Sequence, residues 1–364
     1  MRQNISPDQY RQLFLDDTPL MDVRAPVEFS KGAFPAATNL PLLDDRQREL
    51  VGTEYKRAGQ QAAIELGWRL ATDEVRSQRI AAWREFVEQN PQGCLYCFRG
   101  GLRSQTTRQL LREAGVDYPL VEGGYKGLRN YLLQALDEGA GQLPLVVISG
   151  HTGSGKTELI QSAPRAIDLE GIAHHRGSSF GGTGRPQPAQ IDFENRIAVD
   201  MIKLSEAPGR VFVEDESRLV GRCALPPVLQ EAMQAAPRVL VEEPVEARAR
   251  RIVRDYVNEA LPRFEGGEQH PAEALGKSLR ESLSRLQKRL GGLRYQQLDE
   301  QLQAANRALA DSGSAEAYIP VVMTLLTDYY DGMYDHLMSK RQTEVLFRGS
   351  LQDVEQWIQH NTRG

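Results

Sequence analysis

The sequence predicts an α/β protein of two main domains, the second of which carries a phosphate-binding loop on a parallel sheet. The chain has 364 residues, more than one typical domain contains. Short apolar segments alternate with amphipathic helices in the α/β manner. Residues 145–149 form an apolar run that leads directly into the glycine-rich stretch 150–157, the strand–loop–helix order that a phosphate cradle requires.

The composition is that of an ordinary soluble globular protein, with 40% hydrophobic and 26% charged residues. A net charge of −5 excludes a broadly basic surface, although a local basic groove stays open. Residues 1–17 mix charges early and contain no continuous apolar run, so we expect no secretory signal. The most apolar stretch, 143–148, is too short to span a bilayer, so we expect no membrane partner. Three cysteines imply no disulfide framework and favour a reducing, cytoplasmic location.

The expected elements alternate between strands and helices before the pattern becomes mostly helical after Pro244. We expect strands at 20–24, 93–97, 118–121, 145–149, 210–213 and 238–241, and helices at 75–88, 104–114 and 128–136. The glycine-bearing stretch 137–141 is the best candidate for a domain boundary. We therefore predict domains at 1–137 and 138–310, followed by a mostly helical extension, 311–364, packed on the second domain.

Cys97 is the candidate nucleophile of the first domain. It follows a predicted buried strand and precedes a helix, so the helix N-terminus and the loop N–H groups point toward the sulfur. Gly100 and Gly101 allow an anion-binding turn, and Arg99 and Arg103 add positive charge. A lone cysteine is more often a small buried hydrophobe, but these neighbours favour a reactive thiol.

Cys94 and Cys97 form a Cys-x-x-Cys pair. Zinc is not expected, because no second ligand pair stands at a suitable spacing. Cys94 lies within the predicted strand, which favours a structural role over a redox-resolving one.

The second domain carries the signature Gly-x-x-x-x-Gly-Lys-Thr. Its glycines let backbone N–H groups converge on phosphate oxygens, Lys156 neutralises a distal phosphate, and the Thr157 hydroxyl can bind Mg²⁺. The predicted phosphate-binding residues are Gly150, Gly153, Ser154, Gly155, Lys156 and Thr157. The motif leaves open whether the phosphates belong to a nucleotide or to another diphosphate ester.

Further polar residues are candidates for metal or substrate binding. Glu214 and Asp215 end a predicted strand, as Asp168 and Glu170 do, although acids at strand ends are also routine solvation. The glycine- and serine-rich segment 171–188 is too long for a plain connection, and it contains His175 and Arg176.

Two predicted basic helices could follow a nucleic-acid backbone, although interspersed acids make a solvated face the default. The candidate RNA-contacting residues are Arg248, Arg251, Arg254, Arg280 and Arg285.

Residues 10–135 resemble a rhodanese domain. The motif 22–29, the stretch 31–41 and the Cys97 loop carry this resemblance. It implies that Cys97 carries sulfur or selenium and that Asp22, Arg24 and Glu28 support the fold. Five residues separate Cys97 from Arg103, a loop length that resembles phosphatase-like members and could admit selenophosphate.

With the phosphate cradle downstream, nearly the whole chain resembles the bacterial tRNA 2-selenouridine synthase family. The segments that carry this resemblance are 96–104, 121–126, 150–157, 168–171, 176–178 and 326–331. It implies replacement of sulfur by selenium in a 5-substituted 2-thiouridine at the wobble position of tRNAs for Lys, Glu and Gln. The family proceeds through an S-geranyl intermediate, with geranyl diphosphate and selenophosphate as substrates. We expect no tightly bound cofactor, leave Mg²⁺ open, and expect a monomer.

Two other functions stay open. The chain could be a P-loop kinase or ATPase whose rhodanese-like module only binds an anion. It could also be a cysteine phosphatase, although the sequence offers no clear general acid for that reaction.

Overall fold

The computed structural model describes residues 3–178 and 180–362 and confirms the α/β class. The chain divides into two compact units, described separately below. Unit 1 comprises residues 1–139 and 189–206, and unit 2 comprises 140–188 and 207–364. No helix in the described part of the chain is long and apolar enough to cross a membrane.

Unit 1 is built on a short parallel sheet of order β2–β1–β3. Its strands are β1 (Leu20–Asp22), β2 (Ala37–Asn39) and β3 (Cys94–Tyr96). Its helices are η1 (Pro7–Gln9), α1 (Tyr10–Leu15), α2 (Pro26–Phe29), α3 (Asp45–Leu70), α4 (Asp73–Gln89), α5 (Leu102–Glu113), α6 (Gly124–Ala140) and α9 (Gln190–Leu204). Met21 and Leu95 from the sheet pack with Trp83 and Leu111 from the helices, which gives this unit its own core.

One expectation for unit 1 was wrong in extent. The predicted strand at 118–121 consists only of isolated bridges, Leu95 with Leu120 and Ile5 with Val121, because the chain turns at Gly123 into α6. The division between the two units falls after Gly139, within the stretch 137–141 proposed as the domain boundary, and most of this stretch is helical, since α6 runs to Ala140. Gly139 allows a close approach there, because an added Cβ would lie 3.1 Å from Met201 Cε.

Helix α9 belongs to unit 1, although the sequence analysis assigned residues 189–206 to the second domain. Asp192 Oδ1 accepts a hydrogen bond from Ala33 N at 2.6 Å, and Asn195 Nδ2 donates to Ala33 O at 2.6 Å. Arg129 Nη1 of α6 donates to Asn195 Oδ1 at 2.6 Å. These contacts join α9 to partners distant in the sequence, which a local pattern cannot reveal.

Unit 2 contains a five-stranded parallel sheet of order β10–β9–β4–β6–β5. Its strands are β4 (Leu145–Gly150), β5 (Ala166–Ile167), β6 (Val211–Glu214), β9 (Arg238–Val241) and β10 (Val345–Gly349), with β7 (Leu219–Val220) and β8 (Cys223–Ala224) forming a separate antiparallel pair. Helices associated with the sheet are α7 (Lys156–Ser162), α8 (Leu169–Ala173), α10 (Pro227–Ala235) and α17 (Leu351–Asn361). The sheet packs Val146, Phe212 and Val239 against Leu159 of α7 and Ile358 of α17.

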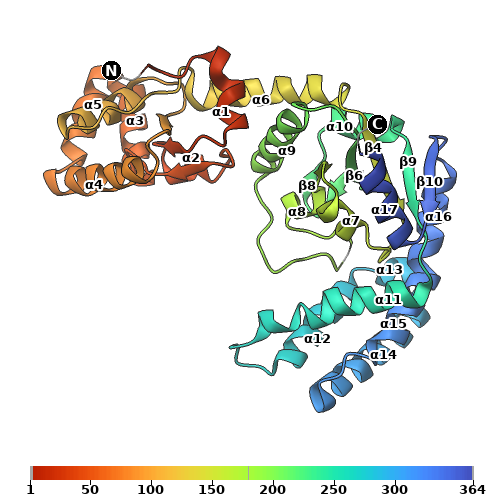
Figure 1. Ribbon diagram of the computed structural model, residues 1–364. Coiled ribbons are helices and arrows are strands. Elements are labelled where there is room, and N and C mark those ends of the chain that lie inside the picture. Colours follow the sequence, from red (N-terminus) through yellow and green to blue (C-terminus); the bar gives the residue numbers. More distant parts are fainter. Residues whose placement is uncertain (1–2, 179, 363–364) are drawn as a thin grey trace. The chain divides into compact units, whose positions relative to one another are not determined.

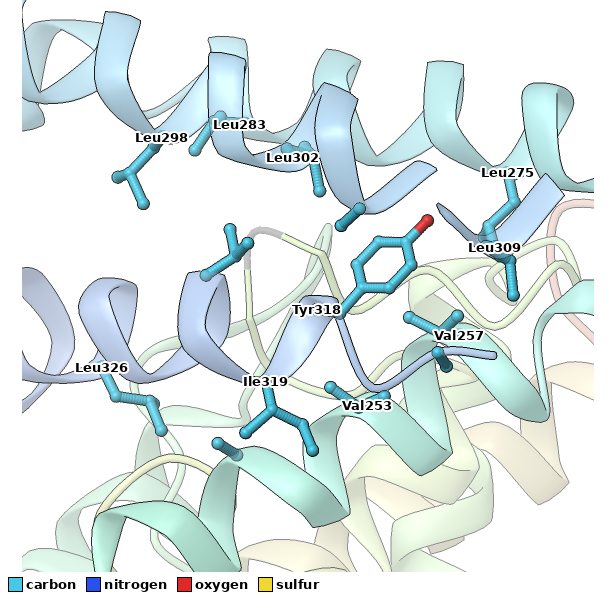
Figure 2. Packing of buried hydrophobic residues seen from close by; sticks show 14 of the residues in the cluster. Val253, Val257, Leu275, Leu283, Leu298, Leu302, Leu309, Tyr318, Ile319 and Leu326 are labelled. Atoms are coloured by element: carbon cyan, nitrogen blue, oxygen red, sulfur yellow. The ribbon is translucent and has the colours of Figure 1, made fainter. Parts of the chain in front are cut away.

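A helical subdomain extends away from this sheet (Figure 1). It comprises α11 (Val245–Val253), η2 (Arg254–Asn258), η3 (Leu261–Phe264), α12 (Pro271–Ser284), α13 (Gln287–Leu290), α14 (Gly292–Ser312), α15 (Tyr318–Leu325), η4 (Leu326–Tyr330) and α16 (Asp331–Ser339). Figure 2 shows its apolar core, with Leu283 and Leu302 pointing toward the helix that carries Tyr318. The helical part predicted after Pro244 is therefore present. The predicted extension 311–364 also contains strand β10, which was not predicted.

Candidate active site

The Cys97 loop connects β3 to α5 in unit 1. Cys97 is 3% exposed, and its Sγ lies 3.2 Å from Ser104 Oγ in the first turn of α5. Gly100 adopts φ +68°, and a Cβ there would lie 3.0 Å from Val121 O. The turn therefore needs glycine, as the sequence predicted, and it places the thiol beneath the N-terminus of a twelve-residue helix.

A second glycine pair, Gly123 and Gly124, packs against the backbone of this loop. At Gly124, an added Cβ would lie 2.3 Å from Cys97 O, so the two segments touch through their backbones. Tyr125 N donates to Cys97 O at 2.8 Å, and Lys126 N donates to Phe98 O at 3.0 Å. The motif at residues 121–126 thus positions the cysteine loop.

The two arginines of the loop differ in their environment. Arg103 is bound to Glu28 through contacts of 2.5 and 3.2 Å, so its charge is already compensated. Burial opposes ionisation of Glu28, but the pairing with Arg103 outweighs burial and lowers the pKa of its carboxyl group. Arg99 is exposed, and none of the ion pairs between described residues involves it. Of the two predicted arginines, Arg103 is therefore held in an ion pair with Glu28.

Asp22 and Arg24 form a buried ion pair behind the loop. Arg24 Nη2 lies 2.6 Å from Asp22 Oδ2 and also donates to Gly32 O at 2.8 Å. Tyr96 Oη donates to Asp22 Oδ2 at 2.7 Å. This geometry suits the fold-supporting role expected for both residues.

The other two cysteines are buried. Burial raises the pKa of the Cys94 thiol to about 12, so this residue stays protonated at neutral pH. Such a thiol suits the structural role predicted for it.

The phosphate cradle of unit 2 has the predicted strand–loop–helix form. Gly153 and Gly155 adopt φ +80° and +94°, and an added Cβ would clash with Ile252 and Leu351, respectively. The Nζ of Lys156 donates to Gly150 O at 2.8 Å, which holds the ammonium group over the loop. Ser154 is fully buried within this loop.

Acidic residues lie beside the cradle. Thr157 Oγ1 donates to Glu170 Oε2 at 2.6 Å. Burial raises the pKa of Glu170 despite this hydrogen bond and the nearby Lys156 charge. Burial and the neighbouring Glu170 carboxylate raise the pKa of Glu216 to about 8. Glu216 directly follows the predicted pair Glu214 and Asp215 in the chain.

The remaining predicted acids have structural partners. Asp168 caps α8 by accepting from Gly171 N at 2.7 Å. Glu214 is fully buried and accepts from Leu169 N at 3.0 Å, and burial raises its pKa well above the ordinary value. Asp215 lies at the cradle, where it accepts from Ser149 Oγ at 2.6 Å and pairs with Arg341 at 2.6 Å.

Glu216 gives folding a pH dependence that can be measured. Its pKa is about 8 in the folded protein, against about 4.3 in an unfolded chain. Between these values the unfolded chain releases a proton that the folded protein keeps, so the free energy of unfolding falls as pH rises. In Glu216→Gln we expect the free energy of unfolding to fall less over this pH range, by on the order of 1–3 kcal/mol.

Urea unfolding at pH 6 and pH 8.5 tests this expectation, with the exposed Glu231→Gln as the matched control. Wild type and Glu231→Gln should lose the same stability between the two values, and Glu216→Gln should lose less. An equal loss in all three proteins would contradict the assignment.

The cradle opens into an apolar cavity of about 300 Å³. Lys156 and Thr157 line one end together with Glu170 and Glu216. The rest of the wall comes from the helical subdomain and includes Leu279, Leu283, Leu298, Leu302, Val322 and Tyr330. Leu298, Leu302 and Leu326, which Figure 2 labels, are among its lining residues. Leu279 and Leu283 come from α12 and Leu298 and Leu302 from α14, so the cavity is assembled from separate helices and no local pattern indicated it.

The predicted tRNA-contacting arginines are divided by the structure. Arg248 is 5% exposed and is bound to Asp331 at 2.7 and 2.8 Å, so it cannot reach a nucleic-acid backbone. Arg251 donates to Gly153 O at 2.7 Å and lines the cavity. The prediction of tRNA contact is therefore corrected for Arg248, and Arg251 is assigned to the cradle.

The other three arginines are exposed. Arg254 is paired with Glu158 and with Asp255, and Arg280 is paired with Asp299 at 2.6 Å. Arg285 lies close enough to His175 to influence its protonation.

The segment 174–181 lies beside the cradle, with Ser179 outside the described residues. Burial and the Arg285 charge lower the pKa of His175. Arg176 lines the cavity and lies 3.2 Å from Glu259. Of this predicted pair, Arg176 therefore belongs to the site, and His175 is a neighbour.

Comparison with known proteins identifies the family. A family model described as the tRNA 2-selenouridine synthase AAA domain matches residues 143–364. A protein named tRNA 2-selenouridine synthase from Alcanivorax borkumensis is 49% identical over 352 residues, covering 96% of this chain and 97% of the relative. This chain belongs to the tRNA 2-selenouridine synthase family.

Other members of the family match over the same length. The tRNA 2-selenouridine synthase of Marinobacter nauticus is 47% identical over 98% of each chain, and that of Shewanella sediminis is 45% identical over 100% of each. The crystal structure of an N-terminal domain from Clostridium difficile 630 matches at 31% identity with a TM-score of 0.33, covering 36% of this chain and 98% of that one. The matched AAA span of this tRNA 2-selenouridine synthase family member contains the whole cradle and its cavity, whereas Cys97 lies before it.

Proposed function

We propose that this protein converts 5-substituted 2-thiouridine at the wobble position of tRNAs for Lys, Glu and Gln to 2-selenouridine. The reaction has two steps. The sulfur is first alkylated with geranyl diphosphate at the cradle of unit 2. Selenium from selenophosphate then replaces the alkylated sulfur at the Cys97 loop of unit 1.

The apolar cavity beyond the cradle is the observation that carries this proposal. A nucleotide would place a polar ribose and base beyond its phosphates, whereas leucine, valine and tyrosine side chains line the space here. A geranyl chain matches these walls, because its burial removes apolar surface from water without leaving polar groups unpaired. The cavity therefore favours a prenyl diphosphate over a nucleoside triphosphate.

The first step is a substitution at the allylic carbon C1 of the geranyl group. The thiocarbonyl sulfur forms a bond to C1, the C1–O bond breaks, and diphosphate leaves with the electron pair. Lys156 and the loop N–H groups stabilise the negative charge that develops on the leaving oxygen. Arg251, held at 2.7 Å from Gly153 O, adds positive charge at the same end of the cavity.

Mg²⁺ fits the same end of the site, although no group of three or more His, Cys, Asp or Glu residues in the described part of the chain could hold a metal alone. Mg²⁺ commonly binds through one or two carboxylates together with substrate phosphates. Thr157, Glu170 and Glu216 would hold it, and a cation there would favour ionisation of the two crowded carboxyl groups. Its chemistry would be to neutralise charge on the diphosphate.

The second step is a substitution at C2 of the base. Selenium adds to C2, the C2–S bond breaks, and the sulfur leaves as geranylthiol after taking up a proton. Water then cleaves any remaining P–Se bond to give phosphate, so no oxidant or reductant is needed. The helix N-terminus and Arg99 supply positive potential for the selenophosphate anion beside Cys97.

The cysteine phosphatase alternative needs a general acid near the loop. Glu28 is the carboxyl group bound to Arg103, and its lowered pKa keeps it ionised at neutral pH. This ionised state makes Glu28 a poor proton donor for phosphate-ester cleavage.

We propose that tRNA is bound in part by Arg254, Arg280 and Arg285, the exposed members of the predicted set. We place the enzyme in the cytoplasm as a monomer. Exposed arginines would follow the phosphate backbone and make affinity dependent on salt.

The cavity predicts a dependence on prenyl chain length. Val322→Phe places a larger side chain in the wall, so we expect at least tenfold slower alkylation with geranyl diphosphate and little change with dimethylallyl diphosphate. Mass spectrometry of nucleosides from thiolated tRNA measures both rates. Leu293→Phe is the matched control, because Leu293 is 72% exposed and does not line the cavity.

Wild-type protein that binds ATP but not geranyl diphosphate, and leaves tRNA unalkylated, would contradict the proposed first step and favour the kinase alternative. If Leu293→Phe, compared with the wild type, slows alkylation with geranyl diphosphate as selectively as Val322→Phe does, the dependence on chain length does not come from this cavity.

A further inference from the structure

Unit 1 contains a second apolar cavity, of about 390 Å³, beside the cysteine loop. Its wall includes Val51, Ile64, Trp68, Trp83, Leu102 and Leu110. The steps described above do not use this cavity.

A sharp bend in α3 forms much of this cavity. Gly59 has φ +85° and ψ −175°, so the segments 45–58 and 60–70 are separate helical arms. Val51 and Tyr55 from the first arm line the same space as Ile64 and Trp68 from the second. The bend, which only glycine adopts readily, therefore creates the cavity.

The cavity and the thiol lie on neighbouring sides of α5. Arg103, Thr106 and Leu110 line the cavity at helical spacing. The next stripe around the helix begins at Ser104, which is fully buried and lies 3.2 Å from Cys97 Sγ. The thiol and the cavity therefore lie on neighbouring faces of the same helix.

The entrance combines apolar and cationic groups. Tyr55, Trp68 and Leu102 are 57%, 40% and 46% exposed, an unusual amount of large apolar surface in one place. Arg76, which is paired with Asp73, and Arg79, whose Nη1 is buried without a hydrogen-bond partner among the described residues, line the same cavity. Apolar walls with guanidinium groups among them match an apolar chain attached to a polyanion.

We propose that this cavity receives the C10 prenyl chain of the S-geranylated wobble nucleoside while selenium replaces its sulfur. The inference rests on the proposed function and extends it, because it gives the leaving geranylthiol its own binding site. Holding the chain orients C2 toward the Cys97 loop. It also separates the prenyl site of the second step from that of the first.

The test uses tRNA whose 2-thiouridine has been alkylated chemically, with either a geranyl or a methyl group, so that enzymatic geranylation is not needed. Full-length protein and selenophosphate are added, and 2-selenouridine is followed by mass spectrometry. Ala63→Phe fills the cavity, and we expect at least a tenfold loss with the geranyl substrate and less than a twofold loss with the methyl substrate.

Trp68→Ala is the second variant, because Trp68 is partly exposed and its truncation is tolerable for folding. We expect a five- to tenfold higher KM for the geranyl substrate and an unchanged KM for the methyl substrate. Leu133→Ala, on a residue that is 41% exposed outside the cavity, should change neither value.

Equal losses with both substrates, or no loss with the geranyl substrate, would overturn the cavity assignment alone. Wild type that converts neither substrate would overturn it together with the selenium step. Failure of enzymatic geranylation in the separate assay, with these chain-length effects intact, would overturn only the first step.

Discussion

Cys97→Ala should lower the rate of 2-selenouridine formation by at least a thousandfold while S-geranyl-2-thiouridine accumulates in the tRNA. The substitution removes the thiol that lies beneath α5 and contacts Ser104 Oγ at 3.2 Å. Cys97 lies beside the selenophosphate anion in the proposed second step, and removal of an active-site side chain can cost several orders of magnitude in rate. The cradle and its cavity lie wholly in unit 2, so alkylation should continue near the wild-type rate. Nucleoside mass spectrometry with geranyl diphosphate and selenophosphate measures both products.

Cys223→Ala is the matched control, because Cys223 is also buried but lies in unit 2 away from both proposed sites. It should form 2-selenouridine at the wild-type rate. Unchanged selenation in Cys97→Ala would remove Cys97 from the reaction and leave its loop as an anion site only.

Lys156→Ala should lower geranyl transfer by at least a hundredfold. The ammonium group is held over the loop by Gly150 O at 2.8 Å, where it would stabilise the departing diphosphate. Loss of one preorganised electrostatic contact typically costs about 10²–10³ in rate. Chemically geranylated tRNA should still be converted to 2-selenouridine, because that step bypasses the cradle.

Lys340→Ala, which removes an exposed lysine of the same unit, controls for net charge. Thermal unfolding of both variants checks that the cradle keeps its fold. Geranyl transfer by Lys156→Ala at the wild-type rate would contradict the assignment of the diphosphate to this cradle.

The parts of the fold that could be predicted are those whose conformation is set by residues close together in the sequence. Glycines at 150, 153 and 155 are required by the turn that they form, so the strand–loop–helix order could be recognised from a few residues. The helix predicted at 75–88 and the strand predicted at 238–241 also match α4 and β9 closely. The resemblance of unit 1 to rhodanese domains stays a prediction.

The features that were missed depend on contacts between distant residues. Strand β10 is only five residues long and joins β9 after more than a hundred intervening residues, so no local pattern indicated it. Arg248 looked like a surface cation because its partner, Asp331, lies 83 positions further along the chain. The two apolar cavities were hidden for the same reason, since each is assembled from several helices.

The assignment of α9 to unit 1 has a consequence for how this protein is made and inherited. Ala33 obtains partners from Asp192 and Asn195, so unit 1 is complete only after the ribosome has synthesised β4, the cradle and α8. Folding of the N-terminal unit during translation is thus delayed until part of the other unit has emerged. A gene split near codon 140 would separate α9 from its partners. The interleaved chain therefore favours keeping both sites in one polypeptide, made in equal amounts.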